Sequence, residues 1–123
     1  MAVRPVTVVE LGSFVRSADA VGLDHLERAT LVDFIARNPT AGVLVKGTGG
    51  LRKVRWARSG GGKSGGYRTI YYFHDLDAPI YAILVYGKGT QADMTSDQRK
   101  TAGIFVAELK QAIRDKRKTG GEA

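Results

Sequence analysis

The residues best suited to chemistry in this sequence are basic, and they lie in one segment. Residues 46–68, KGTGGLRKVRWARSGGGKSGGYR, contain no Asp or Glu. The chain has 19 Lys and Arg against 12 Asp and Glu, and the two signs balance outside this segment, so the formal charge of +7 is concentrated within it. Positive charge of this density predicts binding of a polyanion such as nucleic acid. The seven cations are Lys46, Arg52, Lys53, Arg55, Arg58, Lys63 and Arg68.

A strand predicted over residues 51–57 separates these cations by face. Side chains alternate along a strand, so Lys53 and Arg55 share one face and Arg52 lies on the other. Two cations about 7 Å apart suit successive phosphates, or two oxygens of one phosphate. We therefore expect Lys53 and Arg55 to contact a phosphate backbone, whereas Arg52, Arg58, Lys46 and Lys63 are interpreted as docking charges for a large RNA surface.

Two further cations lie at the ends of neighbouring predicted strands. Arg68 begins the next strand and Lys88 follows the third, so both join the first pair if the sheet presents one basic face. Tyr67 and Tyr86 flank them at strand ends. An exposed ring at such a position can stack on a base, which makes both tyrosines candidate RNA contacts.

The elements that position these residues follow from periodicity and capping. Asp24 with Glu27, and Thr95 with Gln98, have the spacing of capping boxes and mark two helix starts. The pattern predicts one α+β domain over residues 1–123, in the order β-α-α-β-β-β-α, with the three later strands forming an antiparallel sheet. A frayed tail is expected over residues 116–123. Strands are predicted at 5–11, 51–57, 67–74 and 80–86, and helices at 14–20, 24–38 and 96–114.

Composition excludes several function classes. The chain has no cysteine, and its two histidines, His25 and His74, are far apart, so neither a disulfide nor a structural metal site is expected. The glycines near Lys63 lack the spacing of a phosphate-binding loop before a helix, and no nucleotide cofactor is expected. No apolar run approaches the length of a membrane span. A cytoplasmic protein without cofactor is the expectation.

Several of these segments together resemble the RelE/HigB toxins of bacterial toxin–antitoxin systems, within the RelE/ParE superfamily. The resemblance is carried by GGLRKVRWARSGGGKSGGYRTIYYFHD, then by IYAILVYGKG, and by a helix that begins in MTSDQRK. It covers roughly residues 43–109 and is nearest to the HigB type with a long GKSGG hairpin loop. The predicted order of elements agrees with the fold of that family.

The resemblance implies a ribosome-dependent endoribonuclease that cleaves mRNA without a metal. It also implies a cognate antitoxin, commonly a DNA-binding protein from the neighbouring gene. The basic sheet positions of the family fall at Lys53 and Arg55, the arginine of its G-[YV]-R motif at Arg68, and its basic position after the third strand at Lys88. In the implied mechanism Arg68 stabilises the charge on the phosphoryl oxygens, Lys53 or Arg55 positions the scissile phosphate, and Lys88 protonates the leaving 5′-oxygen. Tyr86 is a weaker proton-transfer candidate.

The chain departs from RelE at two positions. Gly89 stands where RelE has an arginine, and residues 93–95 lack the tyrosine that RelE has before its C-terminal element, so the resemblance assigns no general base. Two other functions stay open from sequence: a ParE-like toxin that binds DNA gyrase, and a non-catalytic RNA-binding domain. The clustered Lys53, Arg55 and Arg68 favour the endoribonuclease, because ParE-type chains generally lack such a cluster.

Overall fold

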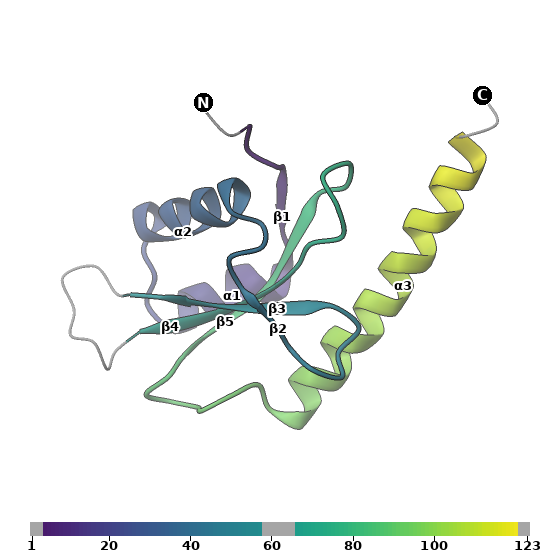
Figure 1. The fold of residues 1–123 in the computed structure, drawn as a ribbon. Coiled ribbons are helices and arrows are strands. Elements are labelled where there is room, and N and C mark those ends of the chain that lie inside the picture. The colour runs from purple at the N-terminus through teal and green to yellow at the C-terminus, as the bar shows by residue number, and fades with distance from the viewer. Residues whose placement is uncertain (1–3, 58–65, 121–123) are drawn as a thin grey trace.

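The computed structural model describes residues 4–57 and 66–120, which form an α+β fold. A five-stranded sheet has two N-terminal helices on one face and the C-terminal helix on the other (Figure 1). The α+β class and the placement of the three helices agree with the sequence prediction. The elements are β1 (Val8–Glu10), α1 (Gly12–Ala20), α2 (His25–Arg37), β2 (Val43–Leu44), β3 (Leu51–Trp56), β4 (Tyr67–Tyr72), β5 (Ile80–Gly87) and α3 (Ser96–Gly120).

The sheet is mixed: its three later strands are antiparallel, as predicted, and β1 adds a parallel strand at one edge. Its strand order is β1-β5-β4-β3-β2, and β1 pairs in parallel with β5 while the other neighbours are antiparallel. The two helices after β1 carry the chain to the far edge, and the meander then returns until β5 runs beside β1. The edge strand β2 was not predicted, because two exposed residues give no periodic signal.

The first face of the sheet packs against α1 and α2. Phe14, Leu31 and Ile35 are fully buried there against Tyr71 of β4, and burial of each such apolar side chain contributes about 1.5–3 kcal/mol. The Tyr71 hydroxyl accepts a hydrogen bond from the Gly42 amide (2.9 Å) and donates one to the Pro39 carbonyl (2.7 Å). Tyr71 thereby fixes the connection that leads into β2.

The second face packs against α3. Ala102 and Val106 of the helix cover Leu51 and Ile70 of the sheet. Ile70 pairs with Leu84 while the next residue, Tyr71, pairs with Ala82, so β5 contains one extra residue at this point. Such a bulge changes the alternation of side chains, and both Ile83 and Leu84 belong to the cluster beneath α3.

The helix starts were predicted more accurately than the end of α3. Asp24 accepts the Glu27 amide at 2.8 Å, and Thr95 and Gln98 exchange two hydrogen bonds in a complete capping box. However, α3 continues to Gly120, well past the predicted end at 114 and into the expected frayed tail. Arg117 contacts Asp75 on the turn after β4, which supports this last part of the helix. Among the described helices, none has an apolar stretch that could cross a bilayer.

Candidate nucleic-acid interface

Three functional candidates form a row across the sheet. Arg55 of β3 lies directly opposite Arg68 of β4, and Arg68 lies opposite Tyr86 of β5. Residues that are directly opposite in antiparallel strands share a face, so the two guanidinium groups and the phenol belong to one surface. Lys53 lies two residues before Arg55 on that same face. The register therefore brings together the cations that strand alternation alone could only divide by face.

Arg68 is a charged side chain with little access to water. Its exposed fraction is 9%, and the hydrogen bond recorded for its guanidinium is a long one, 3.4 Å, to the Tyr67 carbonyl. No Asp or Glu within residues 4–57 and 66–120 forms an ion pair with it. Buried charges are normally paired, because desolvating an uncompensated charge is costly. An anion is the kind of ligand that such a guanidinium can bind.

Asp93 links the row to Lys53. Its Oδ1 atom lies 3.5 Å from Lys53 Nζ and accepts a hydrogen bond from the Tyr86 hydroxyl at 3.3 Å. The same oxygen accepts the Met94 amide at 2.8 Å. The Met94 amide and the nearby Lys53 ammonium hold the pKa of Asp93 below its ordinary value. One carboxylate in the loop before α3 thus holds a lysine and a tyrosine from two different strands.

Tyr86 is held in its neutral form. Burial, together with the charge of Asp93 and the hydrogen bond to it, raises the pKa of Tyr86 to about 12, although the Arg68 guanidinium opposes this. A phenol with this pKa donates a hydrogen bond at neutral pH but does not accept a proton as a base. Tyr86 also has an exposed fraction of only 3%, so the expectation of an exposed stacking ring is wrong for this residue.

Tyr67 is a second correction. Its exposed fraction is 2%, and it belongs to the core cluster beneath α1 and α2, on the face opposite Arg68. It pairs across the sheet with Trp56, which in turn packs on Phe34 of α2 with ring centroids 5.3 Å apart. Helix α2 therefore covers this end of the hairpin, and Tyr67 is a core residue that cannot stack on a base.

Arg52, one of the predicted docking charges, contacts backbone carbonyls of its own chain. It lies on the face opposite Lys53, as alternation predicted, but its Nη1 atom donates to the carbonyls of Gly42 (2.8 Å) and Thr40 (3.4 Å). Its guanidinium is thus used to hold the segment before β2. Lys46 and Lys88 are exposed, in the β2–β3 loop and just after β5. Arg58 and Lys63 lie outside the described residues.

Asp93 is the functional candidate that sequence reasoning missed. It belongs to a loop whose pattern shows no periodicity, and its partners are distant in sequence. The available signal was indirect: no acid occurs from Val43 through His74, so a carboxylate partner for these cations has to come from another part of the chain.

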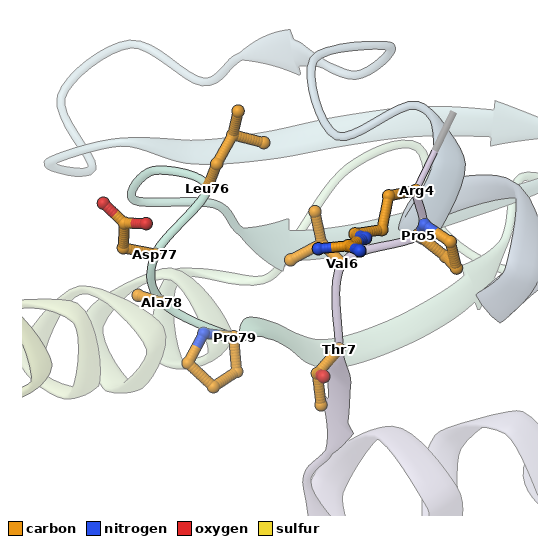
Figure 2. Close-up of a pocket in the computed structure, with 8 residues that line it drawn as sticks. All are labelled: Arg4, Pro5, Val6, Thr7, Leu76, Asp77, Ala78 and Pro79. Carbon is orange, nitrogen blue, oxygen red and sulfur yellow. The ribbon is translucent and has the colours of Figure 1, made fainter. Parts of the chain in front are cut away.

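The hollow drawn in Figure 2 is a different place. It has a volume of about 390 Å³ and lies between residues 4–7 and the turn 76–79. Thr7 accepts the Ile80 amide there, at the start of β5, whereas Tyr86 is near the end of that strand. At about 3.3 Å per residue these points are roughly 20 Å apart. This hollow is therefore separate from the row formed by Arg55, Arg68 and Tyr86.

No family model matches the chain. A solved structure of the E. coli toxin RelE, a mutant in the free state, has 17% sequence identity and a TM-score of 0.47. The match covers 72% of this chain and 90% of that one. The protein is thus similar to a RelE toxin, at low sequence identity and over most of both chains.

Proposed function

We propose that this protein is the toxin of a toxin–antitoxin pair and acts as a metal-independent endoribonuclease on ribosome-bound mRNA. The observation that carries the proposal is the buried Arg68, which forms no ion pair with a described Asp or Glu. It lies opposite Arg55 and Tyr86, on the same face of the sheet as Lys53. Cations in this arrangement suit a phosphodiester, whose charge increases as it is attacked. The sequence resemblance to RelE/HigB toxins supports the RNA target, the antitoxin partner and the cytoplasmic location.

The proposed reaction uses the RNA itself as nucleophile. The 2′-oxygen attacks the adjacent phosphorus, a 2′,3′-cyclic phosphate forms, and the bond from phosphorus to the 5′-oxygen breaks. The 2′-hydroxyl loses its proton and the departing 5′-oxygen gains one, so no oxidant or further reactant is needed. Arg68 and Arg55 stabilise the non-bridging oxygens, since a guanidinium binds two such oxygens at once.

The remaining side chains position the scissile phosphate and protonate the leaving 5′-oxygen in this scheme. Lys53 holds the scissile phosphate, and the exposed Lys88 supplies the proton to the 5′-oxygen. Asp93 has a pKa below that of a free carboxylate and is therefore a weak base, so we assign it the positioning of Lys53 and Tyr86. Tyr86 contributes a neutral phenol beside Arg68 and not a general base.

The experiment is to induce the protein in bacteria and map mRNA ends. We expect cuts confined to translated regions, and loss of the cuts in Arg68→Ala. Removal of one donor that stabilises a developing oxyanion costs about 10²–10³-fold in rate. Arg16→Ala is the control, because it also removes an arginine charge but from an exposed position on α1, and it should cut like the unmodified protein.

Other outcomes identify the alternatives. Intact mRNA with inhibited DNA gyrase would favour a ParE-like toxin, and RNA binding without cuts would favour a non-catalytic binding domain. Full cleavage by a folded Arg68→Ala protein would refute the role given to Arg68. Urea unfolding of each variant shows whether it is folded.

A further inference from the structure

A second concentration of positive charge lies away from Arg55 and Arg68, where the β2–β3 loop meets α3. A groove of about 590 Å³ separates the loop from the first half of the helix. Arg99 of α3 donates a hydrogen bond to the Lys46 carbonyl at 2.9 Å, so the two walls are tied together. The groove is lined by Gly47, Thr48, Gly49, Ser96, Arg99, Lys100, Gly103, Ile104 and Ala107.

The charged residues that line this groove are all cations. Arg99 and Lys100 line it, and a Cβ atom at Gly49 would lie only 3.5 Å from Lys110 Nζ, which places a third cation at its wall. The exposed Lys46 belongs to the loop that forms the other wall. The lining residues include no Asp or Glu. Of the nearby acids on α3, Asp97 lines a hollow on another side of the helix, and Glu108 lines neither.

The part of α3 that forms the floor of the groove has small residues, Gly103 and Ala107. Gly103 lies in the interior of α3, where glycine is a poor helix former. A Cβ at this position would meet no heavy atom within 4 Å, so packing inside the protein does not require glycine there. Ala107, one turn later, adds only a methyl group to the lining of the groove. Ile104, whose exposed fraction is 53%, offers an apolar surface beside them.

We propose that this groove is a second binding site for the sugar–phosphate backbone of single-stranded RNA. Cations along the α3 wall, an exposed lysine on the loop and a floor without side-chain bulk match a polyanionic strand that needs close approach. The start of α3 follows Asp93, which contacts Lys53, so the groove begins near the proposed cleavage site. The inference rests on the proposed RNA target, but it concerns binding and not the chemical step.

The test compares two pairs of variants. Lys100→Glu/Lys110→Glu reverses two charges at the groove, and Lys116→Glu/Lys118→Glu makes the same change near the end of the same helix. Gly103→Glu places a carboxylate on the floor, and Gly103→Gln places a neutral side chain of equal size. The probes are a short 2′-O-methyl oligoribonucleotide, which cannot be cleaved by 2′-oxygen attack, and purified ribosomes without mRNA. The two probes distinguish mRNA from ribosomal RNA as the strand that is bound.

We expect the first variant of each pair to bind at least one probe about tenfold more weakly than its control. Loss of two phosphate contacts should also reduce the slope of log affinity against log salt by about 1.4, at ~0.7 per contact for a single strand. If the two variants of each pair weakened probe binding equally, or not at all, the groove would not be a binding site, while the proposed function would remain intact. Groove variants that bind both probes normally but lose binding to an acidic protein partner would also overturn it. Failure of the unmodified protein to bind either probe would instead refute the RNA target itself.

Discussion

Arg55 and Arg68 lie directly opposite each other on β3 and β4. Like charges that face each other across a sheet destabilise the pair, whereas most cross-strand pairs contribute favourably. Arg55 is exposed and can direct its charge into water, but Arg68 is buried. The two charges repel each other in the free protein, and an anion bound between the two side chains would relieve this repulsion. This relationship links a local cost in stability to ligand binding.

Replacement of Arg55 by threonine should stabilise the free protein. Threonine favours strands, and the substitution removes the facing charge, so we expect a gain of about 0.2–1 kcal/mol in the free energy of unfolding. The same variant should lose most of the additional stability that phosphate confers on the unmodified protein, since a ligand that binds only the folded state stabilises it. Urea unfolding with and without phosphate measures both effects. Arg4→Thr, an equal change of charge at an exposed position outside the sheet, should alter neither; a less stable Arg55→Thr protein would contradict the repulsion.

Tyr86→Phe should retain most of the cleavage activity. Because the pKa of Tyr86 is raised to about 12, its phenol is protonated throughout the neutral range and does not serve as a base. The substitution removes the hydrogen bond to Asp93 but keeps the ring in the core beneath α3. We expect a loss of less than about tenfold, with an unchanged dependence of rate on pH between roughly 6 and 9. Loss of activity as severe as in Arg68→Ala would show that the hydroxyl takes part in proton transfer.

Asp93→Asn should reduce cleavage by weakening the hold on Lys53, by about tenfold. The amide can still accept from Met94 and Tyr86, so the variant removes mainly the charge that faces the ammonium. A double-mutant cycle with Lys53→Gln checks the coupling: the two losses should fall well short of additive. Additive losses in the rate of cleavage would mean that Asp93 acts independently of Lys53.

The same variant has a predicted dependence of stability on pH. The pKa of Asp93 is lower in the folded protein, so its ionised form stabilises the fold above the unfolded value of about 3.8, and this contribution is lost as the pH falls through the lower folded value. The unmodified protein should therefore exceed Asp93→Asn in stability at pH 7 and converge with it in acid. Urea unfolding over this pH range measures the difference, and a constant difference would contradict the assignment.

Strand alternation predicted the faces of the basic residues but not their register. The pattern of β3 correctly separated Lys53 and Arg55 from Arg52. The pairing of Arg55 with Arg68 also depends on how the hairpin between them closes, and a glycine-rich loop does not fix this in the sequence. Asp93 was missed because a contact between a loop and a distant strand has no periodic signature. Local patterns thus gave the composition of the site, and the sheet register and the loop before α3 gave its geometry.

Burial at the end of a strand was equally hard to predict. Tyr67 is next to a glycine-rich loop and therefore resembled an exposed terminal residue, but α2 extends far enough to cover its neighbour Trp56. The end of α3 was underestimated for a related reason. Its last residues are mostly charged, and what supports them is an ion pair with Asp75 that is distant in sequence.

That ion pair between α3 and the turn after β4 leads to a prediction for acid conditions. Two hydrogen bonds of 2.7 and 2.8 Å join the Arg117 guanidinium to the Asp75 carboxylate, and with the Asp77 amide they lower the pKa of Asp75 to about 2. A lowered folded pKa means that the contribution is complete above the unfolded value of about 3.8 and is lost as the pH falls through about 2. Asp75→Asn keeps an acceptor for the Asp77 amide and removes the charge, so it should destabilise the protein at pH 7 by the small amount typical of a solvent-exposed pair, and by less still near pH 2.

Urea unfolding at both pH values, with Arg117→Gln as the partner variant, tests the contribution of this ion pair. The two single substitutions should have similar effects at pH 7, and their combination should cost little more than either, because each removes the same contact. High salt should reduce all three differences, since the pair is open to solvent and is screened. If Asp75→Asn were as stable as the unmodified protein at pH 7 and low salt, the ion pair would not hold the end of α3. The helical content should also fall in these variants. Loss of the ion pair releases the last turns of α3, while the part of the helix that packs on Leu51 and Ile70 remains folded.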